Sequence, residues 1–189
     1  LTAWRMLFTK AQIKPEETAL IFGIGGGVSL AALQLVKQIG ARAIVTSRDD
    51  KKLSRALDLG ADFAINGANE DISRQTLAIT GGRGVDVVIE NVGQAVWPHA
   101  LKSLARGGRL AICGATSGDA PSADLRRLFV RQLQIFGSSL GSLDEYHRML
   151  TFVQHNGLKP VIDAKYAMED IHSALDRLES GRQFGKIAI

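Results

Sequence analysis

Between positions 19 and 48 the chain runs ALIFGIGGGVSLAALQLVKQIGARAIVTSR, and no other stretch restricts its possible folds as strongly. The apolar run 19–22 is short enough for a buried parallel strand. Glycines follow at positions 23, 25, 26 and 27. From Val28 the apolar residues take the spacing of a helix that ends at Gly40, and 43–46 is typical of a second strand. Strand, glycine turn, helix and strand in this order predict a βαβ unit.

The glycine turn is suited to holding a phosphate group. A strict G-x-G-x-x-G pattern would place glycine at position 28, where this chain has Val28. Gly25, Gly26 and Gly27 still permit a tight turn over which a diphosphate can approach bare backbone, and small Ser29 lets the helix pack close to the strand. The helix N-terminus would direct free N–H groups and the positive end of its dipole at this ligand. A glycine-rich turn without a ligand is the alternative.

Composition argues against several other classes of protein. The net charge of the 189 residues is +4 and the basic side chains are scattered, so we expect no nucleic-acid partner. A single cysteine, Cys113, excludes internal disulfides and a cysteine-rich zinc site, and we expect a cytoplasmic protein. No apolar run has the length of a membrane span and no signal peptide is visible, so we expect no membrane partner. Because the chain begins at Leu1 without an initiator methionine, we expect a fragment of a longer protein.

Helical and strand patterns alternate along the rest of the chain. Helices are predicted over 2–12, 49–59, 70–79, 94–104, 122–131, 144–155 and 168–178, and further strands over 62–66, 85–90, 109–113 and 133–137. This alternation predicts an α/β fold: a doubly wound, parallel, six-stranded sheet with helices on both faces and right-handed crossovers.

The expected strands end in small and polar residues. Ligands of such sheets bind outside the carboxyl ends of the strands, where the strand order reverses. Loops need small and polar residues in any case, but together these strand ends predict a groove. Glu90, at the end of the fourth strand, fits either a carboxylate in this groove or a solvated strand end. The strand ends are Thr46-Ser47-Arg48, Asn91-Val92-Gly93, Cys113-Gly114-Ala115-Thr116 and Gly137-Ser138-Ser139.

Several motifs in this order resemble those of the medium-chain dehydrogenase/reductase superfamily, which comprises the zinc-type alcohol dehydrogenases and quinone oxidoreductases. The resemblance extends over essentially the whole chain, although Ser29 replaces the usual last glycine of the turn. The motifs are TAW at 2–4, GIGGGVSLAALQLVK at 23–37, LGADFAIN at 59–66, GRGVDVVIENVG at 82–93, GGRLAICGATSG at 107–118, FGSSLG at 136–141 and GRQFGKIAI at 181–189.

This resemblance implies a domain organisation. Residues 1–160 would form the Rossmann-type NAD(P)-binding domain, with 1–18 as a leading helix and linker. Residues 161–189 would be a C-terminal return segment that contacts a GroES-like catalytic domain preceding Leu1. The family pairs its sixth strand with that of a second copy, so a homodimer through this sheet edge is expected.

Charge at the end of the second strand indicates which nicotinamide cofactor is bound. NAD-specific members of such folds carry a carboxylate there, which holds the ribose hydroxyls and would repel a 2′-phosphate. Here the matching position is Ser47, followed by Arg48 and, one helical turn on, Lys52, which resemble the family's pair around a 2′-phosphate. NADP(H) is therefore favoured, with NAD(H) as the alternative. The acidic residues Asp49 and Asp50 argue against NADP(H), but acidic residues are also typical of a helix N-terminus, here that of the next helix.

The resemblance implies further cofactor-binding residues. Gly25, Gly26, Gly27 and Val28 would lie against the diphosphate, together with Lys186. Asn91, Val92 and Gly93 would contact the nicotinamide ribose. The nicotinamide itself would be flanked by Thr2, Cys113, Gly114, Ala115, Thr116, Ser138, Ser139 and Leu140.

The implied activity is hydride transfer between the nicotinamide cofactor and a carbonyl or alcohol, a quinone or an activated alkene. No residue of this chain is nominated as catalytic or as a metal ligand, and we expect the chain itself to bind no zinc and to be inactive alone. Two alternatives remain open. One is a non-catalytic dinucleotide-binding or sensing module, and the other is an S-adenosylmethionine-dependent methyltransferase, against which the Ser47-Arg48 strand end argues.

Overall fold

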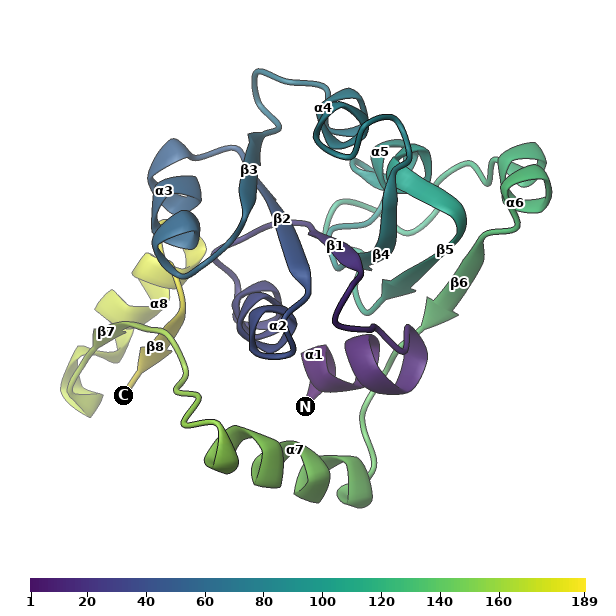
Figure 1. Ribbon diagram of the computed structural model, residues 1–189. Coiled ribbons are helices and arrows are strands. Elements are labelled where there is room, and N and C mark those ends of the chain that lie inside the picture. Colours follow the sequence, from purple (N-terminus) through teal and green to yellow (C-terminus); the bar gives the residue numbers. More distant parts are fainter.

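The computed structural model describes residues 1–189 and contains two parallel sheets flanked by helices (Figure 1). The helices are α1 (Thr2–Trp4), which continues as the π-helical segment η1 (Arg5–Lys10), α2 (Gly27–Gln38), α3 (Asp50–Asp58), α4 (Ile72–Ile79), α5 (Trp97–Ser103), α6 (Leu125–Arg131), α7 (Leu143–His155), the short 3₁₀ helix η2 (Met168–Asp170) and α8 (Ile171–Glu179). The strands are β1 (Thr18–Ile21), β2 (Arg42–Ser47), β3 (Phe63–Asn66), β4 (Val85–Glu90), β5 (Leu104–Ile112), β6 (Gln134–Gly137), β7 (Ile162–Lys165) and β8 (Lys186–Ala188).

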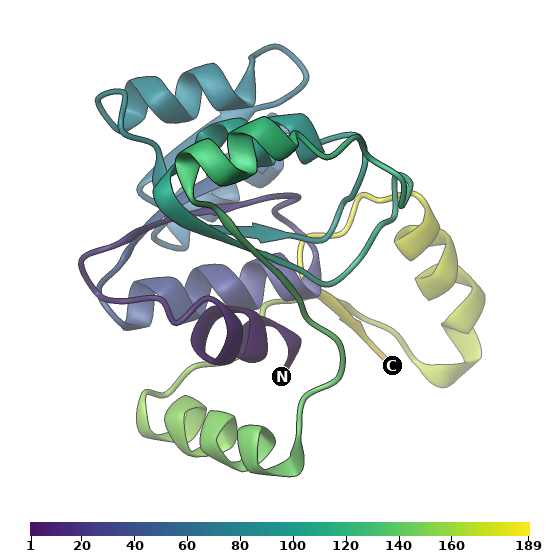
Figure 2. The same cartoon turned by 90° about the vertical axis from the view of Figure 1, so that its right-hand side faces the viewer.

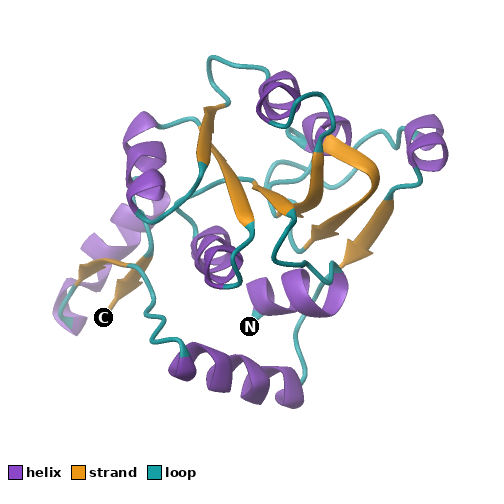
Figure 3. Ribbon diagram, in the orientation of Figure 1, coloured by secondary structure: helices purple, strands orange, loops and turns teal.

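The large sheet has the order β3-β2-β1-β4-β5-β6, and every neighbouring pair is parallel (Figure 3). The strand order reverses between β1 and β4, where Leu20 pairs with Val88. This arrangement confirms the predicted doubly wound, six-stranded α/β fold. The reversal places the loops after β1 and β4 beside each other, which is the position where such sheets bind their ligands.

Helices cover both faces of the large sheet, with a separate apolar core under each layer. The first core joins the faces of α1, η1, α2 and α3 to one side of the sheet, and Leu33 and Val36 of α2 are fully buried in it. The second core lies under α4 and α5 and includes Trp97 and Leu101. The central residues of β1 and β4 are apolar and buried because both of their faces are covered, and the polar residues of these strands, Thr18, Asp86 and Glu90, lie at or near the strand ends. None of the helices combines the length and apolar character that crossing a membrane requires.

Helix α7 is fastened to the first helix by Glu145. Its carboxylate accepts hydrogen bonds from Thr9 and Arg5 and from the backbone N–H of Ser142, which completes a capping box at the start of α7. These hydrogen bonds, that from Thr9 foremost, lower the pKa of Glu145 to about 2.

Several predicted helices differ from the observed ones in where they start or in their hydrogen-bond pattern. The helix expected over 94–104 begins only at Trp97, because the Gln94 N–H bonds to the Gly118 carbonyl and Pro98 occupies the first turn. The helix expected over 122–131 begins at Leu125, where Asp124 supplies the N-cap. In the first helix, i→i+5 hydrogen bonds replace the α-helical pattern from Arg5 onward.

The C-terminal return forms a small unit of its own at one side of the molecule (Figure 2) and lies beside α3 (Figure 1). Strands β7 and β8 pair in parallel, and η2 and α8 connect them. Asp163 of β7 is nearly buried and accepts hydrogen bonds from Arg177 and from the Phe184 N–H, while Arg55 of α3 lies over the Phe184 ring, 4.3 Å from its centroid. These contacts hold residues 181–186 against the large sheet.

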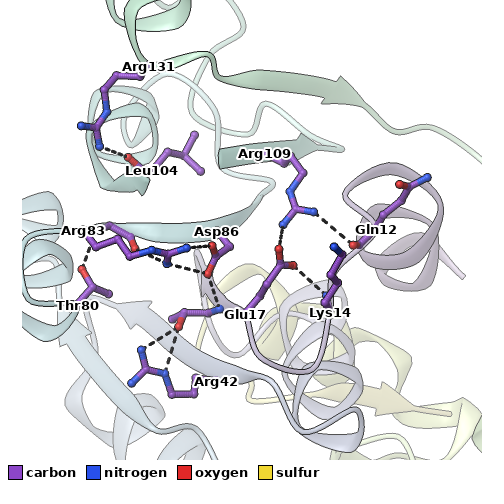
Figure 4. A network of polar contacts seen from close by, with 12 residues as sticks. Gln12, Lys14, Glu17, Arg42, Thr80, Arg83, Asp86, Leu104, Arg109 and Arg131 are labelled. Atoms are coloured by element: carbon purple, nitrogen blue, oxygen red, sulfur yellow. Dashed lines mark hydrogen bonds and ion pairs between the residues drawn. The ribbon is translucent and has the colours of Figure 1, made fainter. Parts of the chain in front are cut away.

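Polar contacts tie the amino ends of the central strands together (Figure 4). Asp86 of β4 accepts hydrogen bonds from the Thr18 N–H of β1 at 2.9 Å and from Arg83 at 3.1 Å. Arg109 of β5 forms an ion pair with Glu17. This network lies at the opposite end of the strands from the glycine turn, so its role is structural.

We predict that Asp86→Asn destabilises the protein by about 1 kcal/mol, because the ion pair with Arg83 is lost while an acceptor for Thr18 remains. Burial raises the pKa of Asp86, but hydrogen bonds from Arg83 and Thr18 outweigh it, so the pKa lies below the ordinary 3.8. The carboxylate therefore contributes stability above that ordinary value, and the contribution is lost as the pH falls through the lower folded-state pKa. Urea unfolding should show the difference between the two proteins shrinking from neutral to strongly acidic pH. A difference that stays constant would show that the charge of Asp86 does not stabilise the fold.

Candidate functional site

The glycine turn leaves exposed backbone at the start of α2. Gly23 and Gly25 have φ angles of +66° and +117°, which side chains rarely tolerate, and Gly26 caps α2 without any side-chain hydrogen bond. Ser29, at the position that departs from the family pattern, donates hydrogen bonds to the carbonyls of Gly23 and Gly26 at 2.9 and 3.0 Å. Ser29 therefore fixes the turn from below, while the N–H groups of the first helical turn stay available to an anion.

A cleft of about 700 Å³ lies over this turn and reaches the end of β2. It brings together the predicted residues Gly25, Gly26, Ser47, Arg48, Lys52 and Val92, and it is also lined by Phe22, Gly23, Ile24, Thr46, Asp49, Gly67, Ile72, Ala95, Val96, Ser117, Gly181 and Gln183. The wall formed by Gly181 and Gln183 belongs to the C-terminal return, which the sequence did not assign to this part of the site.

Both acidic residues after β2 are engaged within the protein. Asp49 caps α3 by accepting from the N–H groups of Lys51 and Lys52, and Asp50 accepts from the Asn66 side chain at 2.6 Å. The interpretation of these residues as helix-start residues is therefore correct, although Asp49 also lines the cleft. Lys52 lies across Gly25 and donates a hydrogen bond to the Gly181 carbonyl.

A second hollow, of about 250 Å³, lies on the other side of the turn. It contains Thr2, Gly27, Val28 and Lys186, together with Gly185 of the C-terminal return. The Lys186 ammonium lies 2.8 Å from the place that a Cβ on Gly27 would occupy, so it covers the N-terminus of α2. Gly185 donates a hydrogen bond to the Gly25 carbonyl at 2.9 Å, which fixes the return segment to the turn.

The third hollow, of about 460 Å³, lies beyond the ends of β5 and β6 and is lined by Ile112, Cys113, Gly114, Ala115, Gly137, Ser138 and Ser139. Burial, and to a lesser extent the charge of Glu90, raises the pKa of the Cys113 thiol. The thiol is therefore neutral near pH 7, which argues against a reactive role.

The remaining predicted residues line none of these hollows. Asn91 and Gly93 belong to the loop after β4 that borders the cleft, and Thr116 donates to the Val92 carbonyl at 3.3 Å. Leu140 is 90% exposed and lines none of the three hollows.

Glu90 differs from both sequence-based expectations. Its side chain is neither solvated nor part of a lining, because the residue is 0% exposed. One carboxylate oxygen accepts hydrogen bonds from the N–H groups of Val92 and Gly93, and the other has no partner. The sequence signal that could have indicated this contact is the position of Glu90 directly before the Asn91-Val92-Gly93 loop. The burial of a charged residue at a strand end, however, is not visible in a single sequence.

The three hollows follow the carboxyl edge of the sheet, and their chemistry suits an elongated anionic ligand. The bare turn and Lys186 fit a diphosphate, Ser47, Arg48 and Lys52 provide polar and basic groups at one end, and small neutral residues line the other. No cluster of three or more histidine, cysteine, aspartate or glutamate side chains is suited to a metal ion.

Comparison with known proteins agrees with this geometry. The family described as zinc-binding dehydrogenase matches residues 27–155. A solved NAD-dependent alcohol dehydrogenase is 38% identical, with a TM-score of 0.91, and the match covers 99% of this chain and 55% of that one. Quinone oxidoreductase from Salmonella typhimurium is 33% identical over 95% of this chain and 58% of its own length.

A third relative was solved with its cofactor. The structure of a 2-octenoyl-CoA carboxylase reductase in complex with NADP and 2-octenoyl-CoA is 27% identical, with a TM-score of 0.89, over 98% of this chain and 46% of that one. The chain thus spans about half the length of its relatives. Because the family match covers most of the residues and the fold agrees throughout, this chain belongs to the zinc-binding dehydrogenase family, within the medium-chain dehydrogenase/reductase superfamily, and corresponds to its cofactor-binding domain.

Proposed function

We propose that this chain is the nucleotide-binding domain of an NADPH-dependent oxidoreductase that transfers a hydride to or from a carbonyl or alcohol, a quinone or an activated alkene. The observation that carries the proposal is the cleft over the glycine turn, with Ser47, Arg48 and Lys52 in its lining. Relatives described as alcohol dehydrogenases, quinone oxidoreductases and carboxylase reductases support the oxidoreductase class.

In this proposal the backbone of the turn holds the diphosphate. The N–H groups at the start of α2 have no side-chain acceptor, and the helix dipole favours a negative charge beside them. The Lys186 ammonium over Gly27 adds a positive charge at the same place. A residue with a side chain at position 25 or 27 would meet Lys52 or Lys186, so glycine keeps the approach open.

NADP is favoured over NAD because the charge balance at the end of β2 is positive. Asp49 caps α3 and Asp50 accepts from Asn66, and of the two only Asp49 lines the cleft, where Arg48 and Lys52 outnumber it. Arg48 is exposed and lines the cleft. A phosphate would replace the Gly181 carbonyl as the hydrogen-bond acceptor of Lys52, so the lysine would lose no hydrogen bond when the cofactor binds. An arginine and a lysine at this place match the doubly charged 2′-phosphate.

The bound nicotinamide ring would supply the hydride chemistry. The residues of this chain bind and orient it: the hollow lined by Cys113, Gly114 and Ser138 offers small neutral groups that let a flat ring approach the backbone. The neutral Cys113 thiol supplies no charge to the reaction. Substrate binding and proton transfer are assigned to the half of the protein that the relatives have in addition to this domain.

Calorimetric titration tests the cofactor preference. The chain should bind NADPH more tightly than NADH, and Arg48→Ala or Lys52→Ala should weaken NADPH binding about tenfold to a hundredfold, because each removes a charged hydrogen bond to the phosphate. NADH affinity should change little in either variant. Lys51→Ala is the matched control, since Lys51 neighbours Lys52 on α3 but does not line the cleft.

Equal affinities for NADPH and NADH, with no effect of either substitution, would contradict the assignment of the 2′-phosphate site. Binding of S-adenosylmethionine without either nicotinamide nucleotide would contradict the oxidoreductase class as well.

We further predict that the purified 189-residue chain binds NADPH but does not oxidise it with quinones, aldehydes or α,β-unsaturated ketones. The hollow beyond β5 and β6 is lined by small residues and the neutral Cys113 thiol, without a carboxylate, histidine, lysine or tyrosine, and no side-chain cluster is suited to a metal ion. The measurement is the loss of NADPH absorbance after addition of each class of substrate. Turnover above the rate without protein would show that the chain contains catalytic groups of its own.

We also propose that two copies associate through β6. This strand pairs only with β5 and leaves its other edge open, and Ile135, Leu140 and Leu143 near it are exposed. An open apolar strand edge of this kind can pair with a strand of another molecule. In a dimer with a two-fold axis, each copy would cover the open edge of the other with the same surface.

Ile135→Lys should convert such a dimer into a monomer, because two lysines would meet across the axis in place of two apolar side chains. Sedimentation velocity measures the change. Leu57→Lys, at an exposed position of α3, is the control that should leave the dimer intact. A wild-type chain that stays monomeric at all concentrations would rule the proposal out.

A further inference from the structure

Glu90 is a charged residue placed where no solvent reaches it. It ends β4 at the strand-order reversal and is 0% exposed. One oxygen accepts from the Val92 N–H and, at 2.9 Å, from the Gly93 N–H, whereas the other oxygen has no hydrogen-bond partner. Burial of a carboxyl group is costly, so its retention here calls for a role beyond filling space.

The loop that Glu90 holds is packed tightly between two other loops of the site. On one side, Val92 lies 3.4 Å from the place that a Cβ on Gly23 of the glycine turn would occupy. On the other side, a Cβ on Gly93 would lie 2.5 Å from the Gly118 carbonyl and 2.9 Å from Ala115. Gly93 also has a φ angle of +95°, which residues with a side chain rarely adopt, so this close packing requires glycine at position 93.

The Val92 residue connects Glu90 to the loop after β5. Its N–H donates to Glu90, and its carbonyl accepts hydrogen bonds from the N–H and the hydroxyl of Ser117, both at 2.7 Å, and from Thr116. The peptide group between Val92 and Gly93 carries this carbonyl and also the Gly93 N–H that donates to Glu90, so its rotation would break hydrogen bonds on both sides. The orientation of the loop after β4 and that of the loop after β5 are therefore set together, with Glu90 as the anchor.

We propose that Glu90 is a positioning residue for the nicotinamide half of the dinucleotide, which acts through the Val92 and Gly93 N–H groups by fixing the loops after β4 and β5. This inference rests on the proposed function and assigns a role to a residue that touches no ligand. In the sheet, β1 separates Glu90 on β4 from the end of β2, and the loop that Glu90 holds packs against Gly114 and Ala115 of the third hollow. We therefore expect the nicotinamide half of the site to depend on Glu90 more than the adenosine 2′-phosphate half does.

The requirement is for a hydrogen-bond acceptor and not for a negative charge. Burial raises the pKa of Glu90, against hydrogen bonds from the Gly93, Val92 and Asn91 N–H groups, and Cys113 is the one titratable neighbour that it influences. A neutral carboxyl group still accepts through its carbonyl oxygen, as an amide does. Glutamine at position 90 should therefore hold the loop as Glu90 does, whereas a side chain without a hydrogen-bond acceptor should not.

The test compares binding of NADPH with binding of adenosine 2′,5′-bisphosphate, which lacks the nicotinamide half. Glu90→Met leaves two buried N–H groups without an acceptor and should weaken NADPH binding about tenfold or more, while the bisphosphate affinity changes less than about twofold. Glu90→Gln should bind both ligands as the wild type does. Glu90→Asp, whose shorter side chain withdraws from the two N–H groups, should show an intermediate loss for NADPH only.

Asp86→Leu is the matched control, because Asp86 is a carboxylate on the same strand that accepts a backbone N–H at the opposite end. Asp86→Leu should lower the melting temperature, but it should not weaken the binding of NADPH more than that of the bisphosphate. If Glu90→Met does not fold, Glu90→Asp and Glu90→Gln decide the question. The inference is overturned if the Glu90 variants weaken both ligands equally or neither. A wild-type chain that binds neither ligand would instead overturn the proposed function.

Discussion

Unpaired backbone N–H groups at the start of α2 are the feature on which the rest of the site depends. A helix N-terminus without a side-chain cap is unsatisfied unless water or an anion reaches it, and here the glycines of the turn place no side chain of their own over it. The surrounding elements are consistent with this purpose. Ser29 fixes the turn from inside the fold, Gly185 fixes the C-terminal return to it, and Lys52 and Lys186 lie on either side of it.

The two ends of the carboxyl edge differ in charge. At the end of β2 the basic groups of Arg48 and Lys52 face the cleft, and the nearby carboxylates are occupied by backbone N–H groups or by Asn66. Beyond β5 and β6 the lining is small and neutral, and the buried Glu90 and Cys113 both have raised pKa values. If NADP(H) binds as proposed, this asymmetry would give the dinucleotide one orientation in the groove, with its 2′-phosphate at the basic end. The C-terminal return contributes to the basic end, so its docking through Asp163 is coupled to the shape of the cleft.

Much of the fold could be predicted from the sequence, because buried parallel strands and amphipathic helices have distinct periodicities and alternate here without interruption. The glycine turn and the basic residues after β2 were also visible, since each follows a strand at a recognisable spacing. Features that depend on distant contacts could not be predicted. The late start of α5 depends on Gly118, the wall of Gly181 and Gln183 depends on the docking of residues 161–189, and the burial of Glu90 depends on the loop that folds over it. Leu140 was assigned to the site by sequence resemblance alone; it is exposed and lines none of the hollows, although its neighbour Ser139 lines the third.

The most direct measurement is nuclear magnetic resonance of the chain with isotope-labelled glycine, titrated with NADPH. If the glycine turn binds the diphosphate, the amide signals of Gly26 and Gly27 should shift most strongly, followed by those of Gly25 and Gly185, while signals from glycines at the opposite end of the sheet, such as Gly84 and Gly107, stay in place. Binding that leaves the signals of Gly25, Gly26 and Gly27 unchanged would contradict the account.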